Sequence, residues 1–492
     1  MVGARGSAAP LITPARGASL EPLCDPISKE NCPTRQIRAR RSGPINVVSS
    51  NVPLAVTLPI RPTKTFDRRG QAAPKQTIEK ESKLRILIYS IFYSPEPTGI
   101  GKVTGEMVDW LASRGHKFKI VVPPPYYPHW KVFKGHSNWR YVIEREDGVD
   151  IFRCPVWMPS KQSGLGRLLL QASFVLTSTP LMLWLAKTWH PEIVLTLMPP
   201  MGGLPTALAA SSLSGAVSWM HVQDFEIDVA FSLGILKGQT WRRRAIKLER
   251  FLVAKFDRVS SITPRMVDAL IKKGIPSDKC RLFSNWVDTE QIFPLARDSS
   301  YRAELDISPR QIVALYSGNL GEKQGLEILV DVAKLITAHT NIQIVICGDG
   351  VGREHLLQLA NGINNIRFLP VQPKERLNDL LNLGDIHLLP QRFEVADLVM
   401  PSKLCGMLAS GRPVVAGASE DTQIAREVLF CGIVVPPEDS VAMARALLEL
   451  SSDPLRRKQL GVAARERSLD QWKKTNILTS FERELSAARP RP

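Results

Sequence analysis

The chain of 492 residues has few cysteines and no pattern that would pair them. Its seven cysteines include no C-x-x-C pair, and none stands at zinc-ligand spacing from a histidine. Neither a disulfide framework nor a zinc site is therefore expected, and a reducing compartment fits. The sequence also lacks a Walker A motif, and G-D-G-V-G at 348–352 continues with Arg353 where a dinucleotide fingerprint needs glycine. ATP-driven phosphoryl transfer and NAD chemistry are disfavoured.

Acidic residues are scarce relative to basic ones. The chain has 64 Lys and Arg against 47 Asp and Glu, which gives a formal net charge of +17. This excess favours anionic partners such as phosphates, nucleic acid or an acidic membrane face, and leaves the fold open. Hydrophobic residues at 44% and charged residues at 23% are ordinary for a globular protein. Collagen-like, coiled-coil and wholly disordered classes are excluded.

Residues 1–82 differ in texture from the rest. They hold ten prolines and thirteen Lys and Arg but no long periodic apolar segment, so we expect a disordered basic tail. No apolar core followed by a small-residue cleavage site is visible, which argues against a secretory signal. The first twenty residues are rich in Arg and Ala and free of acid, as in a transit peptide, but their prolines oppose the amphipathic helix that such a peptide needs.

From Leu84 onward, short apolar runs alternate with helical patterns. The runs lie at 84–90, 119–123, 192–198, 216–222 and 257–263, and again at 311–317, 342–348, 365–370, 385–390, 413–417 and 432–436. Such alternation predicts α/β architecture with parallel sheets covered on both faces. A break at 286–308 separates the two series. We predict two doubly wound, Rossmann-like domains at 83–293 and 294–470, then a closing helix and tail at 471–492.

One helical segment is unusually apolar. Residues 168–186 run for nineteen positions without a charge, close to the roughly 20 that span a bilayer. The segment contains Pro180 and falls between runs assigned to one sheet, which disfavours a span. A buried helix and a membrane-interface helix over 165–187 are the two alternatives. Arg167 and Lys187 flank the segment, and Trp184 and Trp189 lie at its end, which suits the interfacial helix.

Two glycine loops that follow strands are candidate phosphate sites. Gly99 and Gly101, in S-P-E-P-T-G-I-G-K, precede a helix whose first N–H groups are open to an anion. Gly318, Asn319 and Gly321 lie between the first strand and helix of the second series, followed by Lys323, a point charge suited to a diphosphate. The alternatives are a tight βα turn and a solvated lysine.

A third candidate is M-P-S-K at 400–403. Pro401 and Ser402 suit the preceding turn and the N-cap of a helix. Lys403 then stands in the first turn, the unfavourable end of the helix dipole for a cation. A bound anion beside Lys403 would explain that position.

Two further segments sit at the exits of first-series strands. His221 opens H-V-Q-D-F-E-I-D, where nearby acids place a functional role on a par with the commoner structural one. The spacing fits no zinc pattern. P-P-Y-Y-P-H-W at 124–130 carries Tyr126, Tyr127 and Trp130, whose flat faces suit a sugar or lipid. A core-packing loop is the equal alternative.

These motifs together resemble the GT-B retaining glycosyltransferases, and among them the colanic acid biosynthesis glycosyltransferases of the WcaI type. The runs that carry the resemblance are Y-S-P-E-P-T-G-I-G-K, P-P-Y-Y-P-H-W, H-V-Q-D-F-E-I-D, L-Y-S-G-N-L-G-E-K and M-P-S-K-L-C-G-M-L-A-S-G-R-P-V-V-A. The resemblance covers about residues 83–485 and leaves out the tail. It implies two domains facing a cleft, with the acceptor on the first and a nucleotide sugar mostly on the second.

The resemblance also assigns roles to residues. Lys323 matches the pyrophosphate lysine, Gly318 and Gly321 its backbone approach points, Gly99 and Gly101 the phosphate-facing loop, and His221 the residue near the reacting carbon. The family is retaining and needs no metal ion or cofactor. Two departures stand out. Asn319 replaces the usual arginine, and the usual E-x7-E pair is missing, since Leu398 and Gly406 stand at its positions. Lys403 is the expected second cation, and Glu394 or Asp397 the expected ribose contact.

The leading expectation is an enzyme that moves a sugar from a nucleotide-sugar donor onto a polyprenyl-diphosphate-linked acceptor for exopolysaccharide. The donor is GDP-fucose by resemblance alone. It would act in the cytoplasm, peripherally on the inner face of the plasma membrane. A nucleotide-sugar epimerase of the UDP-GlcNAc 2-epimerase kind is the alternative of the same fold. A basic non-catalytic binding protein is the other, although no nucleic-acid-binding module supports a nucleic-acid partner.

Overall fold

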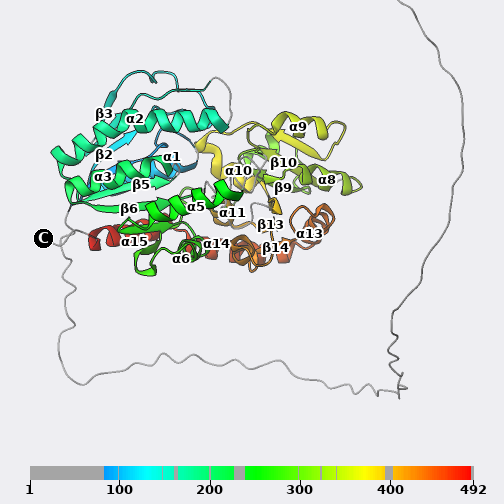
Figure 1. The fold of residues 1–492 in the computed structure, drawn as a ribbon. Coiled ribbons are helices and arrows are strands. Elements are labelled where there is room, and N and C mark those ends of the chain that lie inside the picture. The colour runs from blue at the N-terminus through cyan, green and yellow to red at the C-terminus, as the bar shows by residue number, and fades with distance from the viewer. Residues whose placement is uncertain are drawn as a thin grey trace, which may run out of the picture. The chain divides into compact units, whose positions relative to one another are not determined.

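A computed structural model describes residues 83–488 except 98, 147, 160–163, 199–200, 226–238, 297, 322–323, 340 and 394–402. The expected tail at 1–82 lies outside these residues. The described strands form two sheets that follow one another along the chain (Figure 1). All described cysteines are free and buried, namely Cys154, Cys280, Cys347, Cys405 and Cys431.

The first sheet has eight strands in the order β3-β4-β2-β1-β5-β6-β7-β8. They are β1 (Arg85–Tyr89), β2 (Lys117–Val122), β3 (Val142–Glu146), β4 (Val149–Arg153), β5 (Ile193–Met198), β6 (Val217–Val222), β7 (Arg258–Ser261) and β8 (Cys280–Leu282). All neighbours pair in parallel except β3 with β4. The central strand β5 is buried throughout, which explains its unbroken apolar run.

Helices cover both faces of the first sheet. On one face, α2 (Gly164–Trp189), α3 (Leu204–Ser214), α5 (Gln239–Val253) and α6 (Pro264–Lys272) pack on a core that includes Leu87 and Tyr89. On the other face, α1 (Gly99–Ser113) packs on Ile86 and Ile88. Successive side chains of β1 therefore enter opposite cores, as the period of two in a strand requires.

The second sheet has six parallel strands in the order β11-β10-β9-β12-β13-β14. They are β9 (Ile312–Ser317), β10 (Ile342–Cys347), β11 (Ile366–Leu369), β12 (Ile386–Leu389), β13 (Val414–Gly417) and β14 (Gly432–Val435). Its helices are α7 (Ser300–Glu304), α8 (Glu327–Leu335), α9 (Arg353–Leu359), α10 (Leu377–Leu383), α11 (Lys403–Ala409), α12 (Gln423–Val428), α13 (Ser440–Ser452) and α14 (Pro454–Gln471). Two doubly wound sheets confirm the predicted fold class.

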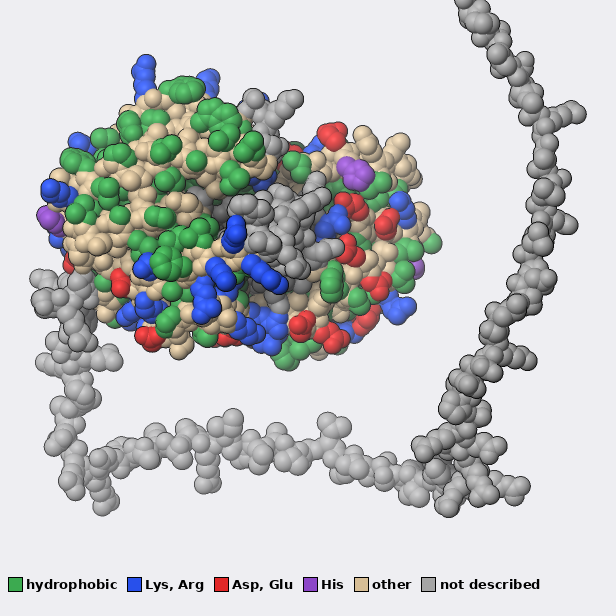
Figure 2. Space-filling model, viewed as in Figure 1, with side chains coloured by type: hydrophobic (Ala, Val, Ile, Leu, Met, Phe, Trp, Pro, Cys, Tyr) green, Lys and Arg blue, Asp and Glu red, His purple; other side chains and the backbone are tan. Residues whose placement is uncertain are grey.

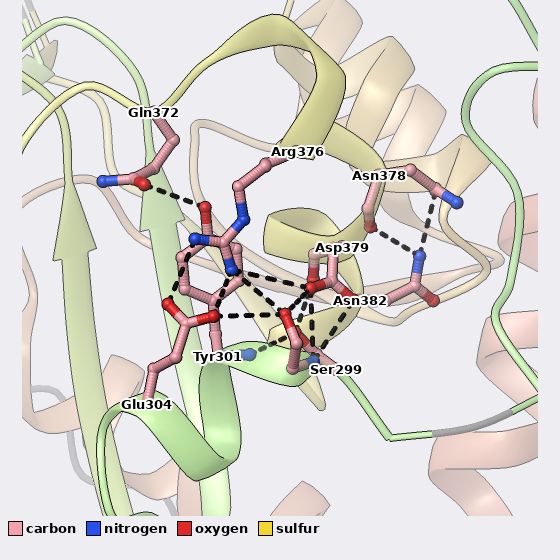
Figure 3. Close-up of polar contacts among 9 residues, drawn as sticks. Ser299, Tyr301, Glu304, Gln372, Arg376, Asn378, Asp379 and Asn382 are labelled. Atoms are coloured by element: carbon pink, nitrogen blue, oxygen red, sulfur yellow. Dashed lines mark hydrogen bonds and ion pairs between the residues drawn. The ribbon is translucent and has the colours of Figure 1, made fainter.

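A polar network fastens the segment that connects the two sheets (Figure 3). The side chain of Asn382 on α10 accepts the backbone N–H of Leu295 at 2.9 Å. Arg376 forms an ion pair with Glu304 of α7 at 2.5 Å, and its guanidinium lies 3.9 Å from the ring centroid of Tyr301. The connecting segment is thus held against the second sheet before β9 begins.

The last helix returns to the first sheet. Leu478, Phe481 and Leu485 of α15 (Lys474–Ala487) are buried in the same core as α1. The ring of Phe481 stacks on that of Phe283 with centroids 3.7 Å apart. The Glu482 carboxylate accepts a hydrogen bond from Arg114 at 2.7 Å. The segment predicted as a closing helix is therefore part of the first sheet's packing, while the domain division itself stays a prediction.

Candidate functional site

The glycine loop after β9 is packed backbone-to-backbone against the loop after β10. Gly348 has a left-handed φ of 150°, and a Cβ there would stand 1.9 Å from the carbonyl oxygen of Gly318. A Cβ at Gly350 would lie 2.6 Å from the carbonyl oxygen of Leu320. The backbone N–H of Gly352 donates to that same oxygen at 2.8 Å. The G-D-G-V-G run is therefore a support that fixes the shape of the candidate phosphate loop.

Lys403 reaches this loop from the first residue of α11. Its Nζ donates to the Tyr316 hydroxyl at 2.6 Å and lies 4.2 Å from the centroid of that ring. The Tyr316 hydroxyl in turn donates to the carbonyl oxygen of Asn319 at 2.8 Å. A Cβ at Gly318 would be 3.4 Å from Lys403 Nζ. The ammonium thus stands beside the backbone of the candidate phosphate loop.

Lys403 is a partly buried cation without a carboxylate partner among the described residues. Burial lowers the pKa of its ammonium to about 7. Burial also raises the pKa of the Tyr316 hydroxyl, so that hydroxyl stays neutral. A site that holds a cation at such cost is suited to an anion that restores the charge.

The other predicted donor-site residues of the second sheet divide into two groups. Asn319 is exposed and Gly321 partly exposed beside Gly318. Lys323, Ser402, Glu394 and Asp397 lie outside the described residues. Among the described acids nearby, Glu327 and Glu438 are both paired with Arg392, at 3.2 and 3.3 Å.

The glycine loop after β1 is built around a buried carboxylate. Glu96 is 3% exposed, and its Oε1 accepts the backbone N–H groups of Tyr126 and Tyr127 at 3.2 and 3.1 Å. Its Oε2 is buried with no hydrogen-bond partner in the described part of the chain. Burial raises the pKa of Glu96 to about 7 despite the hydrogen bonds. A Cβ at Gly101 would stand 2.5 Å from Glu96 Oε2, so this glycine makes room for the carboxylate. Gly99 takes a left-handed φ of 65° and lies near the Tyr127 ring.

Glu96 therefore ties the first glycine loop to the aromatic segment after β2. Tyr126 is 1% exposed and packs against Phe92 and Trp130. Tyr127 and Trp130 are partly exposed, with ring centroids 6.4 Å apart. Because Tyr126 is buried, it supports the loop rather than offering a face to an acceptor. Tyr127 and Trp130 keep partial exposure, and the Arg167 guanidinium lies 4.8 Å from the centroid of the Trp130 ring.

His221 is buried at the end of β6, with both ring nitrogens engaged. Its Nδ1 lies 2.9 Å from Ser260 Oγ and its Nε2 lies 2.9 Å from Gln223 Nε2. The amide donates to Nε2, which leaves the proton on Nδ1. The ring packs on Phe283 at 4.9 Å, and burial lowers the pKa of His221 to about 3. His221 is therefore neutral, and this arrangement does not make it a proton carrier.

Sequence reasoning missed Glu96 and Tyr316. Glu96 stood inside a motif read for its glycines, and Tyr316 inside a run read as apolar strand. Among the described residues, no group of three or more His, Cys, Asp or Glu is placed to hold a metal ion. The arrangement on the second sheet, a loop of backbone groups with a desolvated ammonium, is suited to a phosphate group.

Comparisons with known proteins agree with both halves of this description. Residues 98–286 match the family described as glycosyl transferase 4-like domain, and residues 311–453 match glycosyl transferases group 1. WcaI of Escherichia coli, a glycosyl transferase assigned to colanic acid biosynthesis, is 36% identical over 410 residues, which is 81% of this chain and 98% of that protein.

Solved structures share the arrangement of the two sheets. Sucrose-phosphate synthase from Thermosynechococcus elongatus superposes with a TM-score of 0.64 at 16% identity, covering 82% of this chain and all of that one. Anabaena HepE, in complex with UDP and glucose, superposes with a TM-score of 0.60 at 15% identity over the same shares. At these identities the likeness concerns the fold alone.

Proposed function

Because this chain belongs to the GT4 family of GT-B glycosyltransferases, we propose that it moves a sugar from a nucleotide-sugar donor to a lipid-linked oligosaccharide during exopolysaccharide biosynthesis. The proposed reaction retains the anomeric configuration and uses no metal ion. The proposed acceptor carries a polyprenyl diphosphate. WcaI supports the biosynthetic setting, and the glycine loops support the donor class.

The observation that carries the donor assignment is Lys403 beside Gly318. A desolvated ammonium 3.4 Å from the Cβ position of a loop glycine fits a diphosphate bound against the backbone of that loop. In this proposal the donor's pyrophosphate lies over Gly318 and Gly321 beside Lys403, and Lys323 is the expected second lysine for it. Lys403 then supplies the cation that Asn319 does not. Positive charge there stabilises the departing nucleoside diphosphate, so it accelerates the step in which that charge develops.

The acceptor side of the proposal rests on the first sheet. Tyr127 and Trp130 are partly exposed, and in this proposal a sugar ring stacks on them. Glu96 sets the position of this segment through its two hydrogen bonds. His221 contributes as a neutral group near the donor sugar, positioned by Ser260 and Gln223.

A lipid-linked acceptor places the proposed enzyme at a membrane. We propose that it works in the cytoplasm, peripherally on the inner face of the plasma membrane. That leaflet is anionic, and the chain carries a net charge of +17. HepE was solved with UDP and glucose, whereas the resemblance of the motifs points to GDP-fucose, so the base is left to experiment.

The test is a thermal-shift panel with GDP, UDP, ADP and dTDP. A diphosphate at 100 times its Kd stabilises the folded state by about 2.7 kcal/mol. We expect one of the four to shift the wild type and to leave Lys403→Met and Lys323→Ala unshifted. Lys458→Met, an exposed lysine of α14, is the matched control and should respond as the wild type does.

A second arm follows the reaction itself. Release of the nucleoside diphosphate should depend on added glycolipid acceptor, and the product should carry the donor's anomeric configuration by NMR. If none of the four diphosphates shifted the wild type, the donor assignment would fail. If the chain instead epimerised a nucleotide sugar without any acceptor, the transferase assignment would fail.

A further inference from the structure

The outer face of α2 is apolar and exposed. In the described part of the chain, α2 is the one helix long and apolar enough, by length and composition, to cross a membrane, yet only 28% of its most apolar window is buried. Its inner side packs into the first sheet through Leu170, Phe174 and Met182. Its outer side carries Leu165, Leu168, Leu169, Leu176 and Trp184, exposed at 68, 57, 47, 76 and 56%. Because one side of α2 is packed in the core of the first sheet, the helix lies along a membrane surface more readily than across it.

Aromatic side chains extend this apolar strip on the flank of α2. Tyr141 is 57% exposed, and its hydroxyl donates to the carbonyl oxygen of Thr177 at 2.8 Å. Trp157 is 42% exposed, and its backbone N–H donates to Ser173 Oγ at 2.9 Å. Both are thus anchored beside the helix. Tyr and Trp are the side chains enriched where a membrane meets water.

Helix α5 supplies positive charge on the same side of the sheet, beyond α3, which packs against both α2 and α5. Val253 of α5 and Phe174 of α2 share one core on that side. Arg243 and Lys247 of α5 are exposed, whereas Glu249 is turned inward, where it pairs with Lys273 at 2.9 Å. Figure 2 shows the blue cations over α5 in the same view as the hydrophobic surface over α2.

We propose that the α2–α5 face, meaning Leu165, Leu168, Leu169, Leu176, Trp184, Tyr141, Trp157, Arg243 and Lys247, docks on an anionic phospholipid bilayer. The leucines and aromatic rings enter the headgroup region, and the cations of α5 contact lipid phosphates. The charge favours this occupant over a second copy of the chain, because two copies would oppose cations to cations. The proposal adds a membrane-binding surface to the function proposed above. It rests on that function only for the reason why the enzyme would need to bind a membrane.

The test measures binding of the full-length chain to vesicles without any glycolipid. Vesicles of phosphatidylcholine alone are compared with vesicles of equal parts phosphatidylcholine and phosphatidylglycerol, by flotation. We expect binding to the anionic vesicles only. Because residues 1–82 are present in every variant, their positive charge contributes equally and differences report on the α2–α5 face.

Two double variants separate the apolar and the ionic contributions. Leu168→Ser/Leu176→Ser and Arg243→Glu/Lys247→Glu should each weaken vesicle binding by about 10-fold or more. Matched controls on the second sheet's helices are Leu455→Ser, at a site 66% exposed, and Arg445→Glu/Lys458→Glu. These should bind as the wild type does. High salt should abolish the difference made by the charge variant and leave the leucine variant still defective.

Two results would overturn the proposal. One is equal vesicle binding by all four variants, which would leave the tail as the membrane-binding part. The other is a wild type that sediments as a dimer and becomes a monomer in Leu168→Ser/Leu176→Ser, which would make the face a contact between copies. The nucleotide thermal shift of every variant should stay unchanged, so failure of docking and failure of the transferase proposal are read separately.

Discussion

Replacing Lys403 by methionine should stabilise the protein while removing donor binding. In the folded chain the ammonium is desolvated against Tyr316, and its pKa is lowered from 10.5 to about 7. The unfolded chain holds the proton up to pH 10.5. The folded protein therefore binds fewer protons than the unfolded one between about pH 7 and 10.5. The free energy of unfolding rises with pH across that window, and below it the penalty is complete.

The size of this penalty follows from the shift. Each pKa unit corresponds to about 1.4 kcal/mol, so the full shift sets an upper bound of about 5 kcal/mol. Partial exposure of the residue and relaxation of its surroundings reduce this to about 1–3 kcal/mol. Methionine fills a similar volume and carries no charge, so Lys403→Met should raise the free energy of unfolding by about 1–3 kcal/mol at pH 6.

Urea denaturation from pH 6 to 9.5 measures this effect. The gain of Lys403→Met over the wild type should shrink steadily as pH rises, and Lys458→Met should show no gain at any pH. The same variant should lose the stabilisation by nucleoside diphosphate and most of kcat/KM. Unchanged donor KM and kcat, or a variant less stable than the wild type at pH 6, would refute this account of Lys403.

Three other residues give sharp expectations. Burial holds the Glu96 pKa at about 7, so the free energy of unfolding of the wild type should fall as pH rises from about 4.5 to 7. Glu96→Gln keeps an acceptor for both N–H groups and has no titrating carboxyl. Its free energy of unfolding in urea titrations should stay constant over this range. His221 should show no titration between pH 5 and 8 by NMR, and His221→Ala should lose about 1–3 kcal/mol of stability because Ser260 and Gln223 are left without its nitrogens. Gly348→Ala would bring its Cβ to 1.9 Å from a carbonyl oxygen, so it should lower the free energy of unfolding by more than about 3 kcal/mol and abolish the nucleotide thermal shift. The control is Gly362→Ala, at a left-handed glycine that lies in open space. It should lower the free energy of unfolding by about 1 kcal/mol in the same assay.

The sequence alone established the alternation that makes two parallel α/β sheets. Strands such as β5 and β10 are buried throughout, so their apolar runs are visible in one dimension. It also pointed to the loops after β1 and β9, because glycines after a buried strand mark the carboxyl edge of a parallel sheet. Strand period and glycine conformation are local properties, which is why the sequence expresses them.

Only tertiary structure decided which groups meet at the site. Lys403 and Tyr316 are separated by 87 positions, and Glu96 lies 30 positions from Tyr126. Their pKa values depend on desolvation by distant segments, which no local pattern encodes. The two sides of α2 were equally hidden, because the helix is apolar all round and shows no periodic contrast. Contact with the first sheet buries one side and leaves the other to the solvent, and that choice belongs to the packing of the whole molecule.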